Sequence, residues 1–203
     1  MSQISLSLLI LCLLNFRSNA QFFPSKKFEA GYYYNLKGNK IDGFISLHGS
    51  EKSIFKDRGD YILYKSAKDG KKMKIFSDSI TSFVAGTESY AVSHYAKLKK
   101  IPFVKVITNG EIKLYLSDQE HEYPSTYSTT IPGSVKYNTD TYYFTDTYYF
   151  GANPDNIIEL KKNNFIEGIS LIMADKPGVV SRVKEKKFKY GDIKKIIELY
   201  KNE

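Results

Sequence analysis

The 203-residue sequence contains one cysteine and no tryptophan, and only three of its 30 basic residues are arginines. The cysteine, Cys12, lies in an apolar leader, so the rest of the chain can form no intramolecular disulfide and must be stabilised by its core. Without tryptophan, the chain lacks the best residue for stacking on sugars. Arginine is the side chain that pairs bidentately with guanine and phosphate, so its scarcity predicts no nucleic-acid partner.

The formal net charge is +8, and nearly all of it comes from lysine. A diffuse lysine surface attracts anionic components of a cell envelope over long range. A coding sequence rich in A and T explains the same excess of lysine. The charge alone therefore selects no partner.

The first 20 residues have the pattern of a signal peptide. Residues 4–14 form an apolar run of eleven residues, shorter than the roughly 20 that a membrane-spanning helix needs. Ser18-Asn19-Ala20 is a small-x-small triplet of the kind that signal peptidase cleaves, which predicts a mature chain beginning at Gln21. A retained signal anchor is the alternative, because no Lys or Arg precedes the apolar run. After cleavage we expect a periplasmic or secreted bacterial protein that does not span the membrane.

The segment 21–160 has the pattern of successive β-hairpins. Strand-forming runs flank short turns that contain Gly38, Gly70, Gly86 and Gly110. In the clearest hairpin, residues 103–107 and 112–116 flank Asn109-Gly110, the favoured pair for a two-residue type I′ turn. Repeated hairpins predict an antiparallel sheet, curled or sandwiched, rather than βαβ units.

The segment 161–203 changes to helical periodicity. Apolar residues recur on one stripe from Phe165 to Met173, with Asn163 or Asn164 as the N-cap, and the segment 175–178 ends this helix. A second helix begins near Val179. Asp192 caps a third, in which the apolar positions are Ile193, Ile196, Ile197 and Tyr200. We predict an α+β fold, an antiparallel sheet with three C-terminal helices docked on one face of it.

Residues 118–137 are rich in Ser, Thr, Pro and Tyr, which predicts a long loop. The unit Asp-Thr-Tyr-Tyr-Phe-Thr follows, almost repeated over residues 140–151. Six is an even number, so a strand keeps each repeated residue type on one face. We expect one strand with Phe144 and Phe150 inside and with Tyr143 and Tyr149 more exposed.

The alternative interpretation of this repeat is a tyrosine platform for a glycan or peptide. On that hypothesis the candidate binding residues are Tyr142, Tyr143, Tyr148, Tyr149 and His121. The absence of tryptophan favours sheet structure over the platform.

No motif predicts a catalytic, metal or cofactor site. The three histidines, His48, His94 and His121, are far apart in the sequence and lack ligand spacing. Ser53-x-x-Lys56 and Ser181-x-x-Lys184 match an acylase signature but lack its companion motifs. Arg58-Gly59-Asp60 spells an adhesion tripeptide within ordinary turn chemistry.

Gly31-Tyr32-Tyr33 and residues 38–45 resemble the opening hairpin of an uncharacterised family of signal-peptide-bearing, β-rich exported proteins of Gram-negative bacteria. The family pattern is roughly Gly-Tyr-Ile-Val, Asn-Gly-Asp-Thr and Gly-x-Ile, and Asn39-Lys40 stands where Asp-Thr is usual. The resemblance continues through residues 78–83, 109–110 and 192–200. It implies an exported β-rich domain with helices at its end, and it carries no activity or site residue.

Two functions remain open at this point. The first is a non-catalytic envelope protein, a binding or interaction module for a glycan, peptide or protein. The second is a hydrolase acting on envelope glycan or peptide, with His121 and neighbouring carboxylates as its acid–base group. An enzyme requires a concave site in which a histidine meets a carboxylate or nucleophile, whereas a binding module requires only rigid, exposed aromatic rings.

Overall fold

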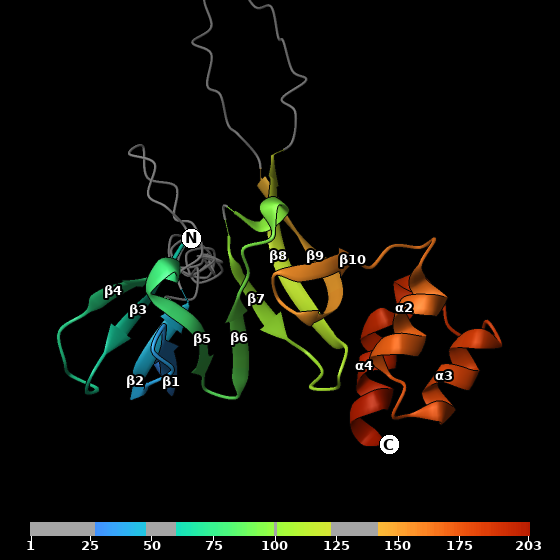
Figure 1. The fold of residues 1–203 in the computed structure, drawn as a ribbon, viewed down its shortest axis with the longest axis horizontal. Helices are drawn as coiled ribbons and strands as arrows, with labels where there is room; N and C mark the ends of the chain where they lie inside the picture. The colour runs from blue at the N-terminus through green and yellow to red at the C-terminus, as the bar shows by residue number, and fades with distance from the viewer. Residues whose placement is uncertain (1–26, 48–59, 100, 123–141) are drawn as a thin grey trace, which may run out of the picture.

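The computed structural model describes residues 27–47, 60–99, 101–122 and 142–203. In these ranges the chain forms one antiparallel sheet of ten strands, which does not close on itself, followed by three α-helices (Figure 1). The strands are β1 (Glu29–Asn35), β2 (Lys40–Leu47), β3 (Tyr61–Lys65), β4 (Met73–Phe76), β5 (Ile80–Ala85), β6 (Glu88–Val92), β7 (Phe103–Val106), β8 (Lys113–Glu122), β9 (Tyr142–Asn153) and β10 (Asn156–Glu159). The helices are α2 (Phe165–Ile172), α3 (Pro177–Lys184) and α4 (Ile193–Asn202), and short 3-10 segments are η1 (Ser77–Ser79), η2 (Ala96–Leu98) and η3 (Tyr190–Asp192). The predicted α+β class is confirmed.

The strand order is β10-β9-β8-β7-β6-β5-β1-β2-β3-β4. Strands that follow one another in sequence are paired, except that the chain passes from β4 through η1 to the far side of β1. Strand β1 therefore lies inside the sheet, where Tyr33 is paired with Ile41 of β2 and with Phe83 of β5. The two edges of the sheet are β4 and β10.

At Gly31, strand β1 approaches β5 so closely that an added β-carbon would overlap the main-chain carbonyl of Val84. Gly31→Ala should push these central strands apart and lower the free energy of unfolding by about 1–3 kcal/mol, the usual cost of overpacking. Gly191→Ala is the matched control, because a β-carbon there has no heavy atom within 4 Å. Urea denaturation compares the two variants, and equal midpoints would contradict the close β1–β5 pairing.

The hairpin around Asn109-Gly110 forms, but the predicted type I′ turn is wrong. Strand β7 ends at Val106 and β8 begins at Lys113, and positive φ among the described glycines occurs only at Gly38 and Gly86. The main-chain N–H of Leu114 donates to the hydroxyl of Thr108 at 2.9 Å. A side chain thus replaces a backbone partner in the ladder, and the wider loop lets Ile107 and Ile112 pack against the helices.

The prediction of a loop over residues 118–137 is wrong for its first five residues. Residues 118–122 belong to β8, which continues to Glu122 and is paired with β9 from Tyr142 onward. The rest of that predicted loop lies outside the described residues. The described part of the tandem repeat, from Tyr142 onward, lies in β9 as one continuous strand, as predicted, with no turn at Thr145 and Asp146.

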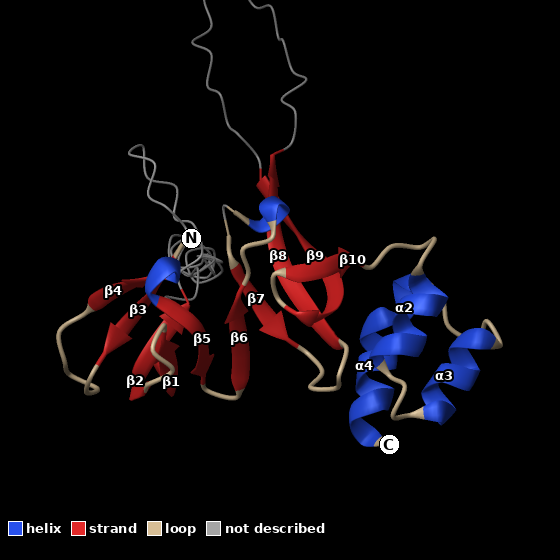
Figure 2. Cartoon of the chain, viewed as in Figure 1, coloured by secondary structure: helices blue, strands red, loops and turns tan. Residues whose placement is uncertain are grey.

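The three helices pack at the β8–β10 end of the sheet (Figures 1 and 2). Their shared core, which we call the helical core, takes its sheet residues from one face of β8 and β9. Its buried members include Leu114, Tyr148, Phe150, Leu160, Phe165, Ile169, Ile172, Val179, Val183, Ile193, Ile196 and Ile197. The predicted burial of Ile169, Ile172, Ile193 and Ile197 is confirmed, whereas Ile166, predicted to lie on the same apolar stripe, is 41% exposed.

The helix starts differ in detail from the predicted caps. Asn164 precedes α2, but its side chain accepts the N–H of Lys161 at 2.6 Å and donates to the carbonyl of Glu159 at 3.0 Å. It therefore fixes the turn before the helix rather than the first helical N–H groups. Pro177, predicted to end the first helix, instead begins α3, where its fixed φ suits the first helical position.

The prediction that Tyr149 is more exposed than Phe150 is wrong. Tyr149 is only 1% exposed, and β9 is buried on both faces where Tyr148, Tyr149 and Phe150 lie. Tyr148 and Phe150 belong to the helical core, whereas Tyr149 packs on the other face in a second core with Leu98 and Ile157. Residues of η2 and β10 cover Tyr149. The alternation of residues within β9 does not show that these two elements pack there.

Candidate functional site

One face of the sheet centre carries a hollow of about 250 Å³, which we call the tyrosine groove. It is slightly smaller than the roughly 300–1,000 Å³ of sites for drug-sized ligands, which suits a single ring or side chain. Its lining comes from β1, β5, β6, the end of β7 and β8, from Asn109 in the β7–β8 loop, and from Pro154 in the β9–β10 turn. The residues that define it are Tyr32, Tyr34, Ser82, Ser89, Asn109, Lys113, Tyr115 and Pro154.

The strand register explains why these side chains share a face. Directly paired residues project to the same side of an antiparallel sheet, and alternate residues along a strand share that side. Tyr34 is paired with Ser82, and Tyr115 is paired with Val106 of β7. The intervening residues, including Tyr33 and Phe83, form a buried core on the opposite face. The groove is therefore held from behind by packed side chains.

The tyrosines of β1 are fixed by their neighbours. The rings of Tyr32 and Tyr34 meet edge to face, with centroids 5.6 Å apart. Lys40 places its Nζ 4.2 Å from the centroid of the Tyr32 ring and also lies 2.7 Å from a carboxylate oxygen of Asp42. These contacts hold the rings in place before any ligand binds, which reduces the entropy lost on binding.

Tyr115 is one of the residues that line the groove, and its buried hydroxyl has no hydrogen-bond partner among the described residues. The side chain is 1% exposed, and leaving a buried polar group unpaired costs about 1–3 kcal/mol. Burial raises the pKa of Tyr115, with a further contribution from the negative charge of Asp155, so the phenol stays protonated and can donate. The hydroxyl of Ser117, two residues along β8, is likewise buried and unpaired.

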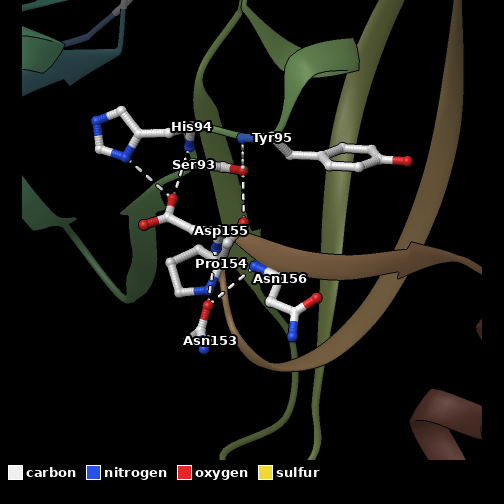
Figure 3. Close-up of polar contacts among 7 residues, drawn as sticks. All are labelled: Ser93, His94, Tyr95, Asn153, Pro154, Asp155 and Asn156. Atoms are coloured by element: carbon white, nitrogen blue, oxygen red, sulfur yellow. Dashed lines mark hydrogen bonds and ion pairs between the residues drawn. The ribbon is translucent and has the colours of Figure 1, made fainter.

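The β9–β10 turn forms one wall of the groove and is fastened to the end of β6 (Figure 3). The hydroxyl of Ser93 donates to the carbonyl of Pro154 at 2.5 Å. Asp155 Oδ1 accepts the main-chain N–H of His94 at 2.7 Å and lies 3.0 Å from its Nδ1. Asn153 accepts the N–H of Asp155 at 3.1 Å, which closes the turn.

Ser93, His94 and Asp155 have the residue types of a nucleophile, a base and a carboxylate, but they are not arranged as a triad. The Ser93 hydroxyl is buried and donates its proton to the Pro154 carbonyl rather than to the imidazole. Figure 3 shows the His94 side chain bonded to Asp155 and pointing away from the Tyr95 ring. Both members of the His94–Asp155 pair are largely exposed, and we interpret the pair as a fastening of the turn.

Charged side chains project from both faces of the sheet centre, with Glu88 and Lys105 on one face and Lys113 on the other. Glu88 bonds to Lys105 and accepts the hydroxyl of Tyr90 at 2.6 Å, and these bonds, led by that from Lys105, lower the pKa of Glu88. Because Tyr90 is paired with Phe83 and with Lys105, the side chains of Glu88, Tyr90 and Lys105 project from the face opposite that of Tyr34 and Ser82, although Phe83 and Tyr90 are also among the residues that line the hollow. Lys113 is a cation that lines the groove, and it makes no ion pair with any residue that the structure describes.

The predicted site residues lie in two parts of the β8–β9 pair, with His121, Tyr142 and Tyr143 near one end and Tyr148 and Tyr149 farther along β9. Tyr148 and Tyr149 are buried in two different cores, so their rings offer no open face there. His121 is paired with Tyr143 in the β8–β9 register, and Tyr142 begins β9, but the side chains of these three lie outside the described residues. His48, Arg58 and Ser53 also lie outside them.

The groove residues Tyr32, Tyr34 and Tyr115 were missed as a site by sequence reasoning. Their strands are predictable, because each lies in a run of strand-forming residues next to a turn. Their proximity is not predictable, since it depends on the pairing of β1 with β5 and of β7 with β8 across most of the sheet.

Within the described ranges, no group of three or more His, Cys, Asp or Glu side chains is placed to hold a metal ion. In the same part of the chain, no helix has both the length and the apolar character needed to cross a membrane. Comparison of the chain with known proteins gave no match to a family model, to a curated protein or to a solved structure.

Proposed function

We propose that this protein is an exported, non-catalytic binding module of the bacterial envelope, and that it binds its ligand in the tyrosine groove. The observation that carries the proposal is Tyr115, a lining residue of a preformed hollow whose buried hydroxyl has no hydrogen-bond partner among the described residues. Unpaired buried polar groups are uncommon in folded proteins and call for an explanation. A ligand group that enters the hollow supplies the missing partner.

The surrounding residues support binding rather than hydrolysis. The rings of Tyr32 and Tyr34 supply apolar surface, while Ser82, Ser89 and Asn109 supply hydrogen-bonding groups around it. Ligand sites typically contain a small number of polar groups placed among aromatic rings. The nearest histidine–carboxylate pair, His94 with Asp155, is engaged in holding the β9–β10 turn.

A titration of isotope-labelled protein with glycan and peptide fractions of a host envelope tests this function. We expect chemical-shift changes to concentrate on β1 and on Ser82, Ser89 and Tyr115, and to disappear in Tyr34→Ala. Phe76→Ala is the control, because Phe76 is an exposed aromatic residue on edge strand β4. Shift changes that persist in Tyr34→Ala, or that fall only on the helices, would contradict binding in the groove.

Export is the second part of the proposal and follows from the leader. The apolar run over residues 4–14 and Ser18-Asn19-Ala20 predict cleavage after Ala20. Intact-mass measurement of the protein from its native host should give a chain that starts at Gln21. Protein that retains Met1 and fractionates with membranes would overturn this prediction.

A further inference from the structure

The position of the tyrosine groove limits the kinds of ligand that it can take. Extended peptides are commonly bound by adding a strand to an open sheet edge, where main-chain groups are free to pair. The groove lies over β1, β5, β6, β7 and β8, each of which is paired with a strand on both sides. The open edges, β4 and β10, are elsewhere. A ligand in the groove is therefore held by side chains and not by strand addition.

The side chains of the groove match the surface of a sugar. A pyranose ring has a face of C–H groups and a rim of hydroxyls, so it needs aromatic surface flanked by small hydrogen-bonding groups. The groove provides the rings of Tyr32 and Tyr34 beside the hydroxyls of Ser82 and Ser89. Tyr115 adds a buried hydroxyl without a partner among the described residues.

Lys113 adds a charge to this surface. It is half-buried, it lines the groove at the start of β8, and it has no anionic partner in the part of the chain that the structure describes. A partly buried ammonium gains most from a ligand carboxylate, because charge-assisted hydrogen bonds are stronger than neutral ones. The other lysine near these rings, Lys40, is already paired with Asp42.

We propose that the groove binds a carboxylate-bearing sugar, with Lys113 pairing with the carboxylate, the edge-to-face pair of Tyr32 and Tyr34 contacting the C–H groups of the ring, and Tyr115 bonding to a hydroxyl. This inference rests on the proposed function, because it names the ligand class of the same groove.

The test is an array of oligosaccharides that contain uronic, muramic or sialic acid, each beside its methyl ester, together with an array of acidic peptides. The full chain binds the acid forms, and the uncharged esters bind at least about tenfold more weakly, the factor that a lost charged hydrogen bond of about 1.5 kcal/mol gives. Lys113→Gln weakens binding of the acids by the same factor and leaves binding of the esters unchanged. Lys162→Gln, at an exposed lysine before α2, changes neither.

The outcomes separate the ligand class from the groove itself. Saccharide binding that is lost in Tyr34→Ala but is unaffected by esterification and by Lys113→Gln overturns the acidic class and leaves the groove as the binding site. If acidic peptides bind instead of saccharides, and this binding depends on Tyr34 and Lys113, the proposal that the ligand is a sugar is also wrong. If no acidic saccharide binds in a Tyr34-dependent way, the inference is wrong.

Discussion

Replacing Tyr149 by alanine should lower the free energy of unfolding by about 3–5 kcal/mol, the usual cost of truncating a buried aromatic side chain. Tyr149 is 1% exposed and packs in the core with Leu98, Tyr115 and Ile157, and its ring meets that of Tyr95 edge to face at 6.0 Å. A loss of this size would take a large part of a typical total stability of about 5–15 kcal/mol. Chemical denaturation followed by far-UV circular dichroism measures it.

Phe76→Ala is the control for Tyr149, because it removes an aromatic ring that is 41% exposed on an edge strand. We expect it to cost much less, since a large part of the Phe76 side chain is already in contact with water in the folded chain. Equal losses of unfolding free energy in the two variants would mean that η2 and β10 do not cover the face of β9 that carries Tyr149.

Ile196→Ala should lower the free energy of unfolding by about 2–5 kcal/mol. The side chain is 0% exposed and lies in the helical core, which joins α4 to Leu114 and Phe150 of the sheet. Truncation leaves a cavity where sheet and helices meet, so the melting transition of the whole chain should shift to lower temperature and remain single.

Leu171→Ala is the matched control for the helices, because Leu171 lies on α2 with 48% of its surface exposed. We expect its midpoint to stay close to that of the parent chain. If Ile196→Ala instead produced two transitions, with the sheet melting as in the parent, the helices would form an independent unit.

Local pattern accounts for most of the secondary structure. The hairpin strands follow from glycine-containing turns, and the helical stripes at Ile169, Ile172, Ile193 and Ile197 are buried as their spacing predicts. The Asn109-Gly110 turn is different, because the hydroxyl of Thr108 takes the place of a ladder carbonyl. Turn propensity does not include this bond between a side chain and the backbone six residues along the chain.

The candidate site depends on contacts that no local pattern contains. Gly31 and Val84 are far apart in sequence, yet the approach of β1 to β5 at this point brings Tyr34 next to Ser82. The repeat in β9 suggested an exposed tyrosine face because alternation within one strand shows only that its two faces differ. It does not show what covers each face, and here η2 and β10 cover Tyr149.

The proposed function depends on the Tyr115 hydroxyl having no partner in the free protein, and this premise can be tested without a ligand. If this hydroxyl is kept for a ligand, Tyr115→Phe removes an unpaired buried polar group and should raise the free energy of unfolding of the free protein, by about 1 kcal/mol. Tyr64→Phe is the matched comparison, because the Tyr64 hydroxyl donates to the carbonyl of Asp42 at 2.9 Å. Its loss should lower stability by about 0.5–1.5 kcal/mol.

The decisive measurement is therefore the unfolding free energy of Tyr115→Phe beside that of Tyr64→Phe, obtained by urea denaturation without ligand. We predict opposite signs, a gain for Tyr115→Phe and a loss for Tyr64→Phe. A loss in Tyr115→Phe as large as that in Tyr64→Phe would show that the Tyr115 hydroxyl already has a partner within the folded chain, and it would contradict its role as the binding group of the tyrosine groove.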